Sequence, residues 1–239
     1  MRVACRIPIV VLLGLFGCSR DAATGSPPGA PVTSAPAAPA APHAPKPDPS
    51  SKPKVVVLGD SLSAGLGLAQ VDAYPALLEG KLHAAGFDWD VVNAGVSGDT
   101  SAAGLQRVDY ALDEPNVRIL ILELGANDGL RGLPVEEMKK NLGAIIERAQ
   151  TKHVAVLLAG MEAPPNFGPE YTVSFRQAYR DLAKEHKVTL LPFLLDKVAG
   201  DAALNQADGI HPNVEGARIV ADNVWAVLKP MVTTVRAAS

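Results

Sequence analysis

The sequence is poor in cysteine and has no strong excess of either charge. It holds 22 basic and 25 acidic residues, with a formal net charge of −3 and a pI near 5.9, and no run of lysine or arginine exceeds two residues. Domains that bind nucleic acid usually carry a basic patch, so this composition argues against a nucleic-acid partner. The only cysteines are Cys5 and Cys18, which leaves little material for a disulfide framework or a cysteine-based zinc site.

The first residues have the pattern of a secretory signal. Arg2 precedes the apolar segment Ile7–Phe16, whose ten residues are too few to cross a bilayer, which takes about 20, and fit a signal-peptide core. The segment ends in Leu15-Phe16-Gly17-Cys18, which resembles the lipobox of bacterial lipoproteins. That resemblance implies cleavage of the signal peptide, residues 1–17, and lipidation of Cys18. The alternative is an ordinary secretory signal with a chance cysteine.

Cleavage at this point would leave Cys18 as the one cysteine of the mature chain. No intramolecular disulfide, zinc site or thiol-redox site could then form, and no metal is expected. Ser19 stands where an aspartate would resemble an inner-membrane retention signal. We therefore expect a lipid-anchored protein of the bacterial cell envelope, at the outer membrane or the periplasmic face. Residues 18–53 hold ten of the twenty prolines and are expected to form a disordered tether.

From Lys54 onward, strand-like and helix-like segments alternate. Strands that are apolar on both faces and alternate with helices are typical of a parallel sheet covered by helices on both sides. The sequence therefore predicts one three-layer α/β/α domain over residues 54–232, followed by a C-terminal tail at 233–239. The expected strands are Lys54–Leu58, Asp90–Asn93, Val117–Glu123, Val154–Leu158 and Val188–Leu191. The expected helices are one capped by Asp72 and ended by Gly86, Ala102–Leu112, one opened by Pro134, Tyr171–His186, and Val214–Leu228 capped by Asn213.

Polar clusters follow four of the five predicted strands. In a parallel sheet the loops after the strands lie at one edge, so clusters that are far apart in the sequence converge there. Any one cluster would be weak support for a site, but four that converge are strong support. They are Gly59-Asp60-Ser61-Leu62, the loop 93–100, Gly125-Ala126-Asn127-Asp128, and Asp208-Gly209-Ile210-His211-Pro212.

These clusters contain the groups that serine hydrolysis needs, namely a hydroxyl, a base, a group that orients the base, and donors for an oxyanion. Ser61 supplies the hydroxyl, although a lone serine after a strand is by default a helix cap. His211 is the best base, and Asp208 lies three residues before it, so one turn of chain can present both side chains. The oxyanion donors would be the Ser61 N–H, the Gly98 N–H and the Asn127 amide.

The four clusters resemble the four sequence blocks of the SGNH (GDSL) hydrolases. The similarity is closest to the branch of multifunctional acyl-CoA thioesterase I, lysophospholipase L1 and arylesterase, and it covers about Lys54 to Val232 in order. It implies that Ser61 is the nucleophile, with Asp208 and His211 as the other members of the triad. It also implies a flavodoxin-like sheet with strand order 2-1-3-4-5, and it assigns the Ser61 N–H, Gly98 and Asn127 to the oxyanion hole.

The loop 160–168 is similar to the substrate-facing loop of that branch in its Pro-x-Asn-aromatic-Gly core. It has Glu162 and Ala163 where the branch often has a basic residue and a larger apolar one. By this resemblance the loop would contact substrate, and the two departures bear on acyl-chain and head-group preference. The loop residues expected to contact substrate are Glu162, Ala163, Pro164, Asn166 and Phe167.

The sequence therefore predicts a monomeric, lipid-anchored serine esterase or thioesterase that acts through an acyl-enzyme on Ser61. Its partners would be the membrane and a small-molecule ester or thioester, such as an acyl or aryl ester, a lysophospholipid or an acyl-CoA-like thioester, which implies a role in lipid metabolism. No cofactor is expected. A carbohydrate O-acetylesterase of the cell envelope is the alternative enzyme, and an envelope binding lipoprotein is the non-catalytic alternative.

Overall fold

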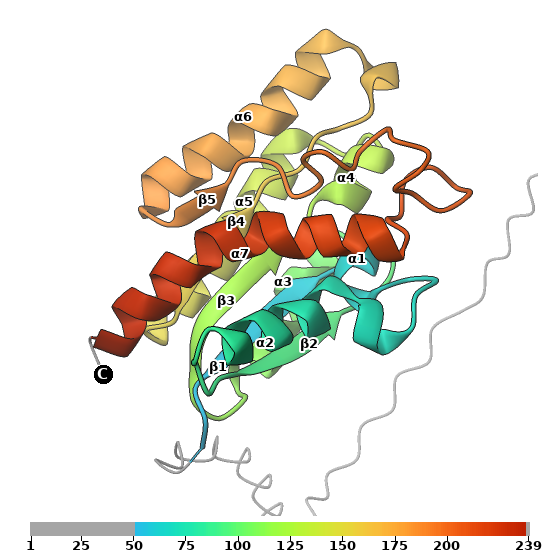
Figure 1. Ribbon diagram of the computed structural model, residues 1–239. Helices are drawn as coiled ribbons and strands as arrows, with labels where there is room; N and C mark the ends of the chain where they lie inside the picture. The colour runs from blue at the N-terminus through green and yellow to red at the C-terminus, as the bar shows by residue number, and fades with distance from the viewer. Residues whose placement is uncertain (1–50, 238–239) are drawn as a thin grey trace, which may run out of the picture. The chain divides into compact units, whose positions relative to one another are not determined.

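A computed structural model of the chain describes residues 51–237. The predicted signal peptide, Cys18 and nearly all of the predicted tether lie outside the described residues. In the described part, a five-stranded parallel sheet has the strand order β2-β1-β3-β4-β5 (Figure 1). This confirms the predicted fold class and strand order. The strands are β1 (Lys54–Gly59), β2 (Asp90–Gly95), β3 (Val117–Glu123), β4 (Ala155–Ala159) and β5 (Thr189–Leu191).

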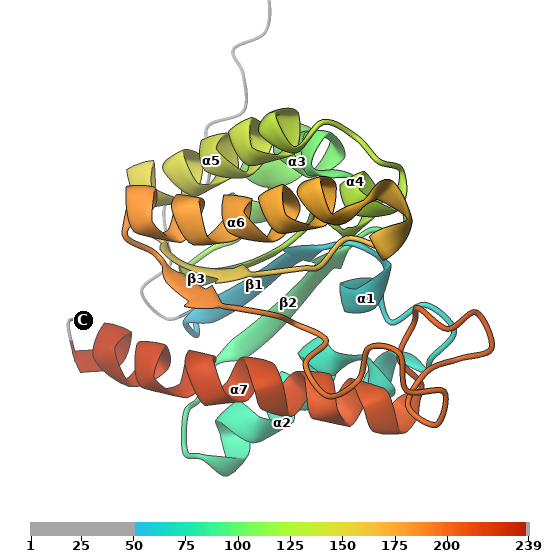
Figure 2. The ribbon, with the colours of Figure 1, turned by 90° about the horizontal axis from the view of Figure 1, so that it is seen from above.

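Helices cover both faces of the sheet and complete the three layers. Figure 2 shows α3, α5 and α6 on one face and α2 with α7 on the other. The long helices are α2 (Tyr74–Ala84), α3 (Ser101–Leu112), α5 (Val135–Thr151), α6 (Pro169–His186) and α7 (Val214–Ala237). The short ones are α1 (Ser61–Ala64), α4 (Ala126–Leu130) and the 3₁₀ turns η1 (Gln70–Asp72) and η2 (Pro165–Phe167).

The core lies on both sides of the two central strands. Val55–Leu58 in β1 and Ile119–Leu122 in β3 are fully buried, because helices cover the side chains that point to either face. This explains why both strands are continuous apolar runs rather than alternating ones. On α5, the side chains that face the sheet recur every three or four residues, as expected for an amphipathic helix. They are Met138, Leu142, Ile145, Ile146 and Ala149.

Two helix ends differ from the expected ones. Asp72 does not cap α2, because it is the last residue of η1 and Ala73 takes the N-cap position, with no side-chain hydrogen bond. Helix α7 continues past Leu228 and through Pro230 to Ala237, so it runs beyond Val232, where the sequence predicted the domain to end. Pro230 lies on the exposed side of α7, and Val232 is fully buried. Burial of Val232 explains why the helix continues past a residue that interrupts its hydrogen bonding.

Helix α7 begins where the sequence predicted. The Asn213 side-chain oxygen accepts the backbone N–H groups of Glu215 and Gly216, which satisfies two donors at the first turn. Among residues 51–237, no helix is both long and apolar enough to cross a membrane.

Candidate active site

The predicted clusters lie at the carboxyl edge of the sheet. Ser61 opens α1 directly after β1, Asn127 lies in α4 after β3, and the loop that carries His211 connects β5 to α7. Both views show α1 beside the loop that precedes α7 (Figures 1 and 2). The sheet therefore brings together residues that are up to 150 positions apart in the sequence.

Ser61, His211 and Asp208 form one hydrogen-bonded chain. The Ser61 Oγ lies 2.8 Å from His211 Nε2, and His211 Nδ1 lies 2.7 Å from Asp208 Oδ2. When Nδ1 carries the proton and donates to Asp208, Nε2 is the acceptor that faces the Ser61 hydroxyl. In this tautomer the imidazole can take the serine proton. The three groups that the sequence selected are therefore in contact.

A tight turn holds Asp208 against the histidine. Asp208 Oδ1 accepts the backbone N–H groups of Ile210 and His211, each at 3.0 Å, while Oδ2 faces the imidazole. The Ile210 N–H, followed by the His211 side chain and backbone N–H, lowers the pKa of Asp208 to about 2, because each donor favours the ionised carboxylate. Asp208 is thus fixed as an anion. Gly209, at φ +75°, supplies the left-handed residue within the turn.

Asp60 connects the serine loop to Asn127. Its Oδ1 accepts the Leu62 N–H at 3.0 Å and caps α1, and its Oδ2 accepts an amide hydrogen of Asn127 at 3.1 Å. An amide has two N–H donors, so this bond fixes the orientation of Asn127 and leaves its second donor for another acceptor. Burial raises the pKa of Asp60 to about 6, although the Leu62 and Asn127 donors oppose the increase.

Ser61 is the first residue of α1, and its N–H therefore has no partner within the helix. Together with the free amide hydrogen of Asn127, it can donate to an oxyanion beside the Ser61 Oγ. Gly98 lies in the exposed loop after β2, at φ +86°, and its carbonyl accepts a hydrogen bond from Arg131 at 2.9 Å. Gly98 does not line the cavity beside Ser61, so its part in an oxyanion site remains a prediction.

Sequence reasoning missed Glu123, which lies under the serine loop at the end of β3. It is fully buried, and its Oε2 accepts the Asp60 N–H at 3.2 Å and the Ser63 hydroxyl at 2.6 Å. Its Oε1 is buried without a hydrogen-bond partner. Burial, followed by the nearby charge of Asp60, raises the pKa of Glu123 well above its usual range. The available signal was a carboxylate directly after the apolar run Ile119–Leu122.

Arg107 of α3 was also missed, and it connects two of the predicted loops. Its guanidinium donates to the carbonyls of Gly59, at 2.8 Å, and Ala94, and it pairs with Asp99 at 2.6 Å. One side chain therefore joins the ends of β1 and β2. Five donors in a rigid fork suit arginine to this position.

A cavity of about 500 Å³ opens beside Ser61. Ser61, His211 and Asn127 line it on one side. The loop 160–168 contributes Met161, Glu162, Ala163, Pro164 and Pro165, whereas Asn166 and Phe167 do not line it. The Phe167 ring instead packs against the Tyr171 ring in a tilted arrangement, with the ring centroids 5.3 Å apart. The cavity is large enough for a small ester, and three of the five predicted loop residues face it.

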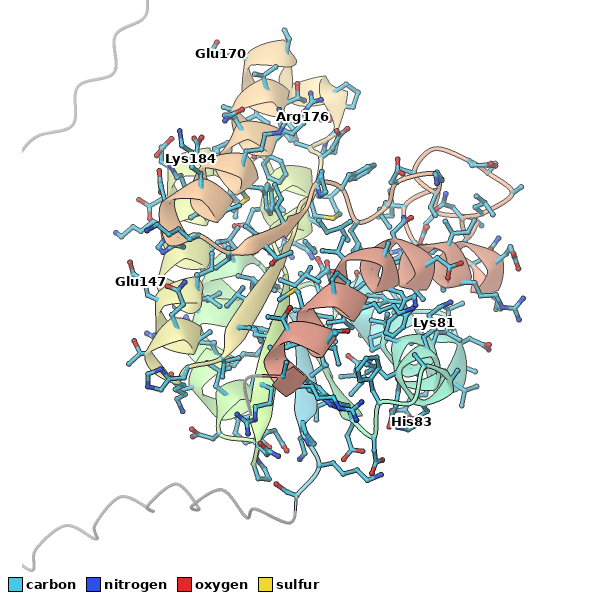
Figure 3. The ribbon with its side chains drawn as sticks, turned by 60° about the vertical axis from the view of Figure 1, so that its left-hand side comes forward. Lys81, His83, Glu147, Glu170, Arg176 and Lys184 are labelled. Atoms are coloured by element: carbon cyan, nitrogen blue, oxygen red, sulfur yellow. The ribbon has the colours of Figure 1, made fainter. Side chains whose placement is uncertain are left out.

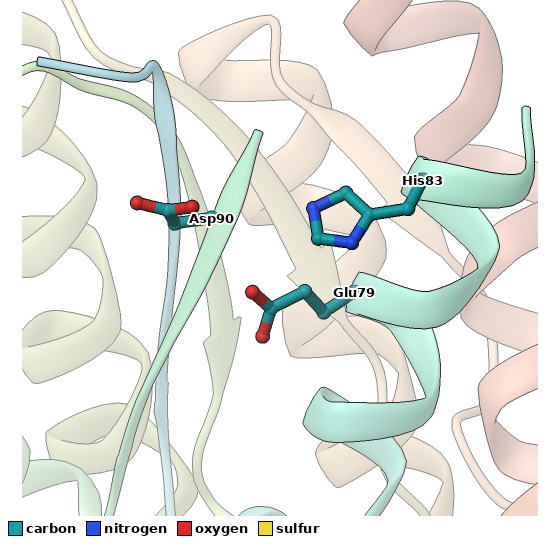
Figure 4. A group of neighbouring side chains, drawn as sticks. All are labelled: Glu79, His83 and Asp90. Carbon is teal, nitrogen blue, oxygen red and sulfur yellow. The ribbon is translucent and has the colours of Figure 1, made fainter. Parts of the chain in front are cut away.

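No metal ligands gather at this site, but one group elsewhere in the described part of the chain resembles a metal site. Glu79 and His83 on α2 and Asp90 on β2 have ligand atoms within 4.8 Å of one another (Figure 4). His83 Nε2 contacts the Trp89 carbonyl at 3.0 Å, and Lys52 lies 4.0 Å from Asp90. A hydrogen bond and a lysine therefore already engage part of the group.

Comparison with known proteins places these residues in a family. Residues 57–219 match the GDSL-like lipase/acylhydrolase family. The chain is 42% identical to the esterase TesA of Pseudomonas aeruginosa over 177 residues, which cover 74% of this chain and 88% of that protein. It is 39% identical over 178 residues to thioesterase 1/protease 1/lysophospholipase L1 of Escherichia coli, with 74% and 84% covered.

A solved structure has the same fold. The psychrotrophic esterase EstA from Pseudoalteromonas, in a crystal structure inhibited by monoethylphosphonate, superposes with a TM-score of 0.72 at 34% identity. The match covers 75% of this chain and 98% of that one. The likeness therefore extends over the α/β domain and its sheet-edge loops.

Proposed function

This chain belongs to the GDSL-like lipase/acylhydrolase family and is a serine hydrolase of the esterase/thioesterase type, and from this premise we propose that it hydrolyses its substrates through an acyl-enzyme on Ser61. The observation that carries the proposal is the hydrogen-bonded chain from Ser61 through His211 to Asp208. A hydroxyl, a base and a group that orients the base are the minimum for this chemistry.

In acylation, the Ser61 Oγ attacks the substrate carbonyl carbon while His211 Nε2 takes the hydroxyl proton. The carbonyl oxygen becomes an oxyanion, which accepts hydrogen bonds from the Ser61 N–H, the Gly98 N–H and the Asn127 amide. The carbon–oxygen or carbon–sulfur bond then breaks, and His211 gives its proton to the leaving alcohol or thiol. In deacylation, His211 takes a proton from water, the resulting hydroxide attacks the acyl carbon, and Ser61 recovers its proton as the acid leaves.

Asp208 stabilises the imidazolium that forms in both steps. Its pKa of about 2 keeps it ionised at neutral pH. Asp60 has a positioning role, because it aligns the Asn127 amide before a charge develops on the substrate. Preorganised donors of this kind contribute more to the rate than donors that must reorient.

The relatives are named esterase, thioesterase, lysophospholipase and arylesterase. We propose the corresponding substrates for this chain, namely short-to-medium acyl or aryl esters, lysophospholipids and acyl-CoA-like thioesters. A cavity of about 500 Å³ with mainly apolar walls supports this proposal. Rates on a chain-length series of para-nitrophenyl esters are compared with the rate on an O-acetylated glycan. This comparison distinguishes an acyl or aryl esterase from a carbohydrate O-acetylesterase.

Labelling of the full-length protein with a fluorophosphonate probe tests the serine directly. We expect the wild type to be labelled and Ser61→Ala to be unlabelled and inactive on every ester. The matched control is Ser174→Ala, which removes an exposed hydroxyl on α6 and should be labelled like the wild type. Labelling that persists in Ser61→Ala would exclude Ser61 as the nucleophile. A wild type that neither reacts nor hydrolyses any ester would instead be a binding lipoprotein.

We also propose that Cys18 carries a lipid anchor and that the enzyme acts at the cell envelope. The support is the Leu15-Phe16-Gly17-Cys18 sequence after a short apolar segment. In a bacterial host, metabolic labelling with a fatty acid should mark the wild type and should be lost in Cys18→Ala. Equal labelling of both proteins would rule out this anchor.

A further inference from the structure

Apart from the base His211, the titratable side chains in the wall of the cavity beside Ser61 are acidic. Among the described residues that line it, the carboxylates are Asp60 and Glu162, and neither lysine nor arginine is present. The two oxygens of Asp60 already accept the Leu62 N–H and the Asn127 amide. Glu162 is therefore the carboxylate in the wall whose charge is available to a substrate.

Glu162 lies in the loop 160–168, and its side chain is 46% exposed. Its Oε1 is 3.6 Å from Nη1 of Arg176, which belongs to α6 and is 44% exposed (Figure 3). A pair at this distance and exposure is weak, so Arg176 offsets only part of the negative charge. Arg131 follows the cavity residue Leu130 but does not line the cavity, and its guanidinium donates to the carbonyl of Gly98, which does not line it either.

A charge that enters this cavity would lie within several ångströms of Glu162. In a partly solvated environment, charges at such a distance interact strongly enough to change relative rates by about three- to tenfold. The charge of Glu162 would lower the relative rate for a substrate whose entering group is anionic and raise it for one whose entering group is cationic. An uncharged group is unaffected.

We propose that the cavity favours esters in which the group that enters it, either the acyl group or the leaving group, is neutral or cationic over esters in which that group is anionic. Glu162 is the residue responsible for this selectivity. This inference rests on the proposed esterase function, since it concerns the same cavity. It concerns compact substrates, in which the charge lies near the reacting carbonyl. In a coenzyme A thioester the phosphates are held on a long arm, away from the carbonyl.

The test uses two matched substrate series, because either arm of the ester could enter the cavity. In the first, the leaving group varies: butyrylthiocholine, its neutral isostere with a tert-butyl group, and the S-butyryl ester of mercaptopropionate. In the second, the acyl group varies: para-nitrophenyl hexanoate and para-nitrophenyl hemiadipate. The full-length wild type is compared with Glu162→Gln and Arg176→Gln, and the ratio of kcat/KM for the anionic and the neutral substrate is measured.

In at least one series, Glu162→Gln should raise the anionic-to-neutral ratio by about three- to tenfold. Arg176→Gln should lower the same ratio, because it leaves Glu162 unpaired. Added salt should reduce both effects, because it screens charges that face solvent. These opposite directions separate an effect of charge from a general disturbance of the loop, which would change both variants alike.

Ratios that stay within twofold of the wild type in both variants and both series would overturn the inference. The proposed function is judged separately on the neutral substrates. If Ser61→Ala hydrolysed them as fast as the wild type, the acyl-enzyme on Ser61 would be wrong. If the wild type hydrolysed them and Ser61→Ala did not, unchanged ratios would remove only the role of Glu162.

Discussion

Replacing Glu123 with glutamine should change how the stability of the fold depends on pH. The carboxyl is fully buried under the serine loop, where Oε2 accepts the Asp60 N–H and the Ser63 hydroxyl and Oε1 has no partner. Glutamine keeps the shape and one acceptor oxygen but cannot ionise. Its NH₂ group would take the place of the unpartnered Oε1, and a buried donor without an acceptor costs about 1–3 kcal/mol.

The sign of the pH dependence follows from burial. Burial raises the pKa of Glu123 well above its usual range and that of Asp60 to about 6. A carboxyl whose pKa is higher in the folded state stabilises the fold below its unfolded pKa, and this stability is lost as the pH rises through the folded value. For Asp60, a rise from 3.8 to about 6 corresponds to roughly 3 kcal/mol at about 1.4 kcal/mol per unit. For Glu123 the loss continues to higher pH.

The wild type should therefore lose stability as the pH rises, and Glu123→Gln should lose less. Near pH 5 the variant should be about 1–3 kcal/mol less stable than the wild type. The gap should close by up to about 1.4 kcal/mol per pH unit as the pH rises from 5 towards the raised folded pKa of Glu123. Asp60 keeps most of its own pH dependence in the variant, because desolvation is the largest cause of its shift.

Urea unfolding curves at a series of pH values and constant ionic strength measure this difference. The matched control is Glu147→Gln, which removes an exposed carboxylate on α5 (Figure 3) and should give a curve parallel to that of the wild type. A difference between the wild type and Glu123→Gln that stays constant with pH would refute the reasoning. It would mean that Glu123 has the same pKa in the folded and unfolded chains.

Three further predictions concern the site and its support. Asn127→Ala should lower kcat by about 10²–10³ with a smaller change in KM, and a loss below tenfold in steady-state assays would contradict an oxyanion role. Asp208→Asn should lower kcat by about 10³–10⁴, whereas near-normal turnover would show that the base needs no orienting anion. Gly59→Ala should cost about 1–3 kcal/mol, because the added Cβ would overlap the Ser63 and Glu123 side chains. The free energy of unfolding is measured with denaturant, and the control is Gly80→Ala. The added Cβ at position 80 meets nothing within 4 Å, so this variant should stabilise α2.

Local patterns were sufficient to predict the layers and the three side chains, Ser61, His211 and Asp208, that the structure joins by hydrogen bonds. Val117–Glu123 was predicted with the bounds that the structure gives, because a run of β-branched and aliphatic residues that is too short for a helix has few other solutions. Ser61, Asp208 and His211 could be selected because each stands in a polar cluster after a strand, and parallel strands end at one edge. The strand order came from the family resemblance, because alternation alone does not fix which strands are neighbours.

Contacts between distant residues were not predictable in the same way. The Asp60 carboxylate accepts a hydrogen bond from Asn127, and Arg107 joins the loops after β1 and β2. Both contacts depend on groups that meet only after the sheet has formed. The end of α7 was missed for a related reason. Pro230 is a local signal to stop a helix, but the buried packing of Val232 is a tertiary effect that outweighs it.

The Gly-Asp-Ser sequence of the serine loop is best understood through its neighbours. Gly59 is required because the Glu123 carboxyl and the Ser63 hydroxyl occupy the space of a Cβ. Asp60 is required because it both caps α1 and holds Asn127. Glu123 in turn accepts donors from the residue before Ser61 and from the second residue after it, so it holds the backbone on both sides of Ser61. The three-residue sequence alone is therefore a weak predictor of the site, and together with a buried carboxylate at the end of the neighbouring central strand it becomes a specific one.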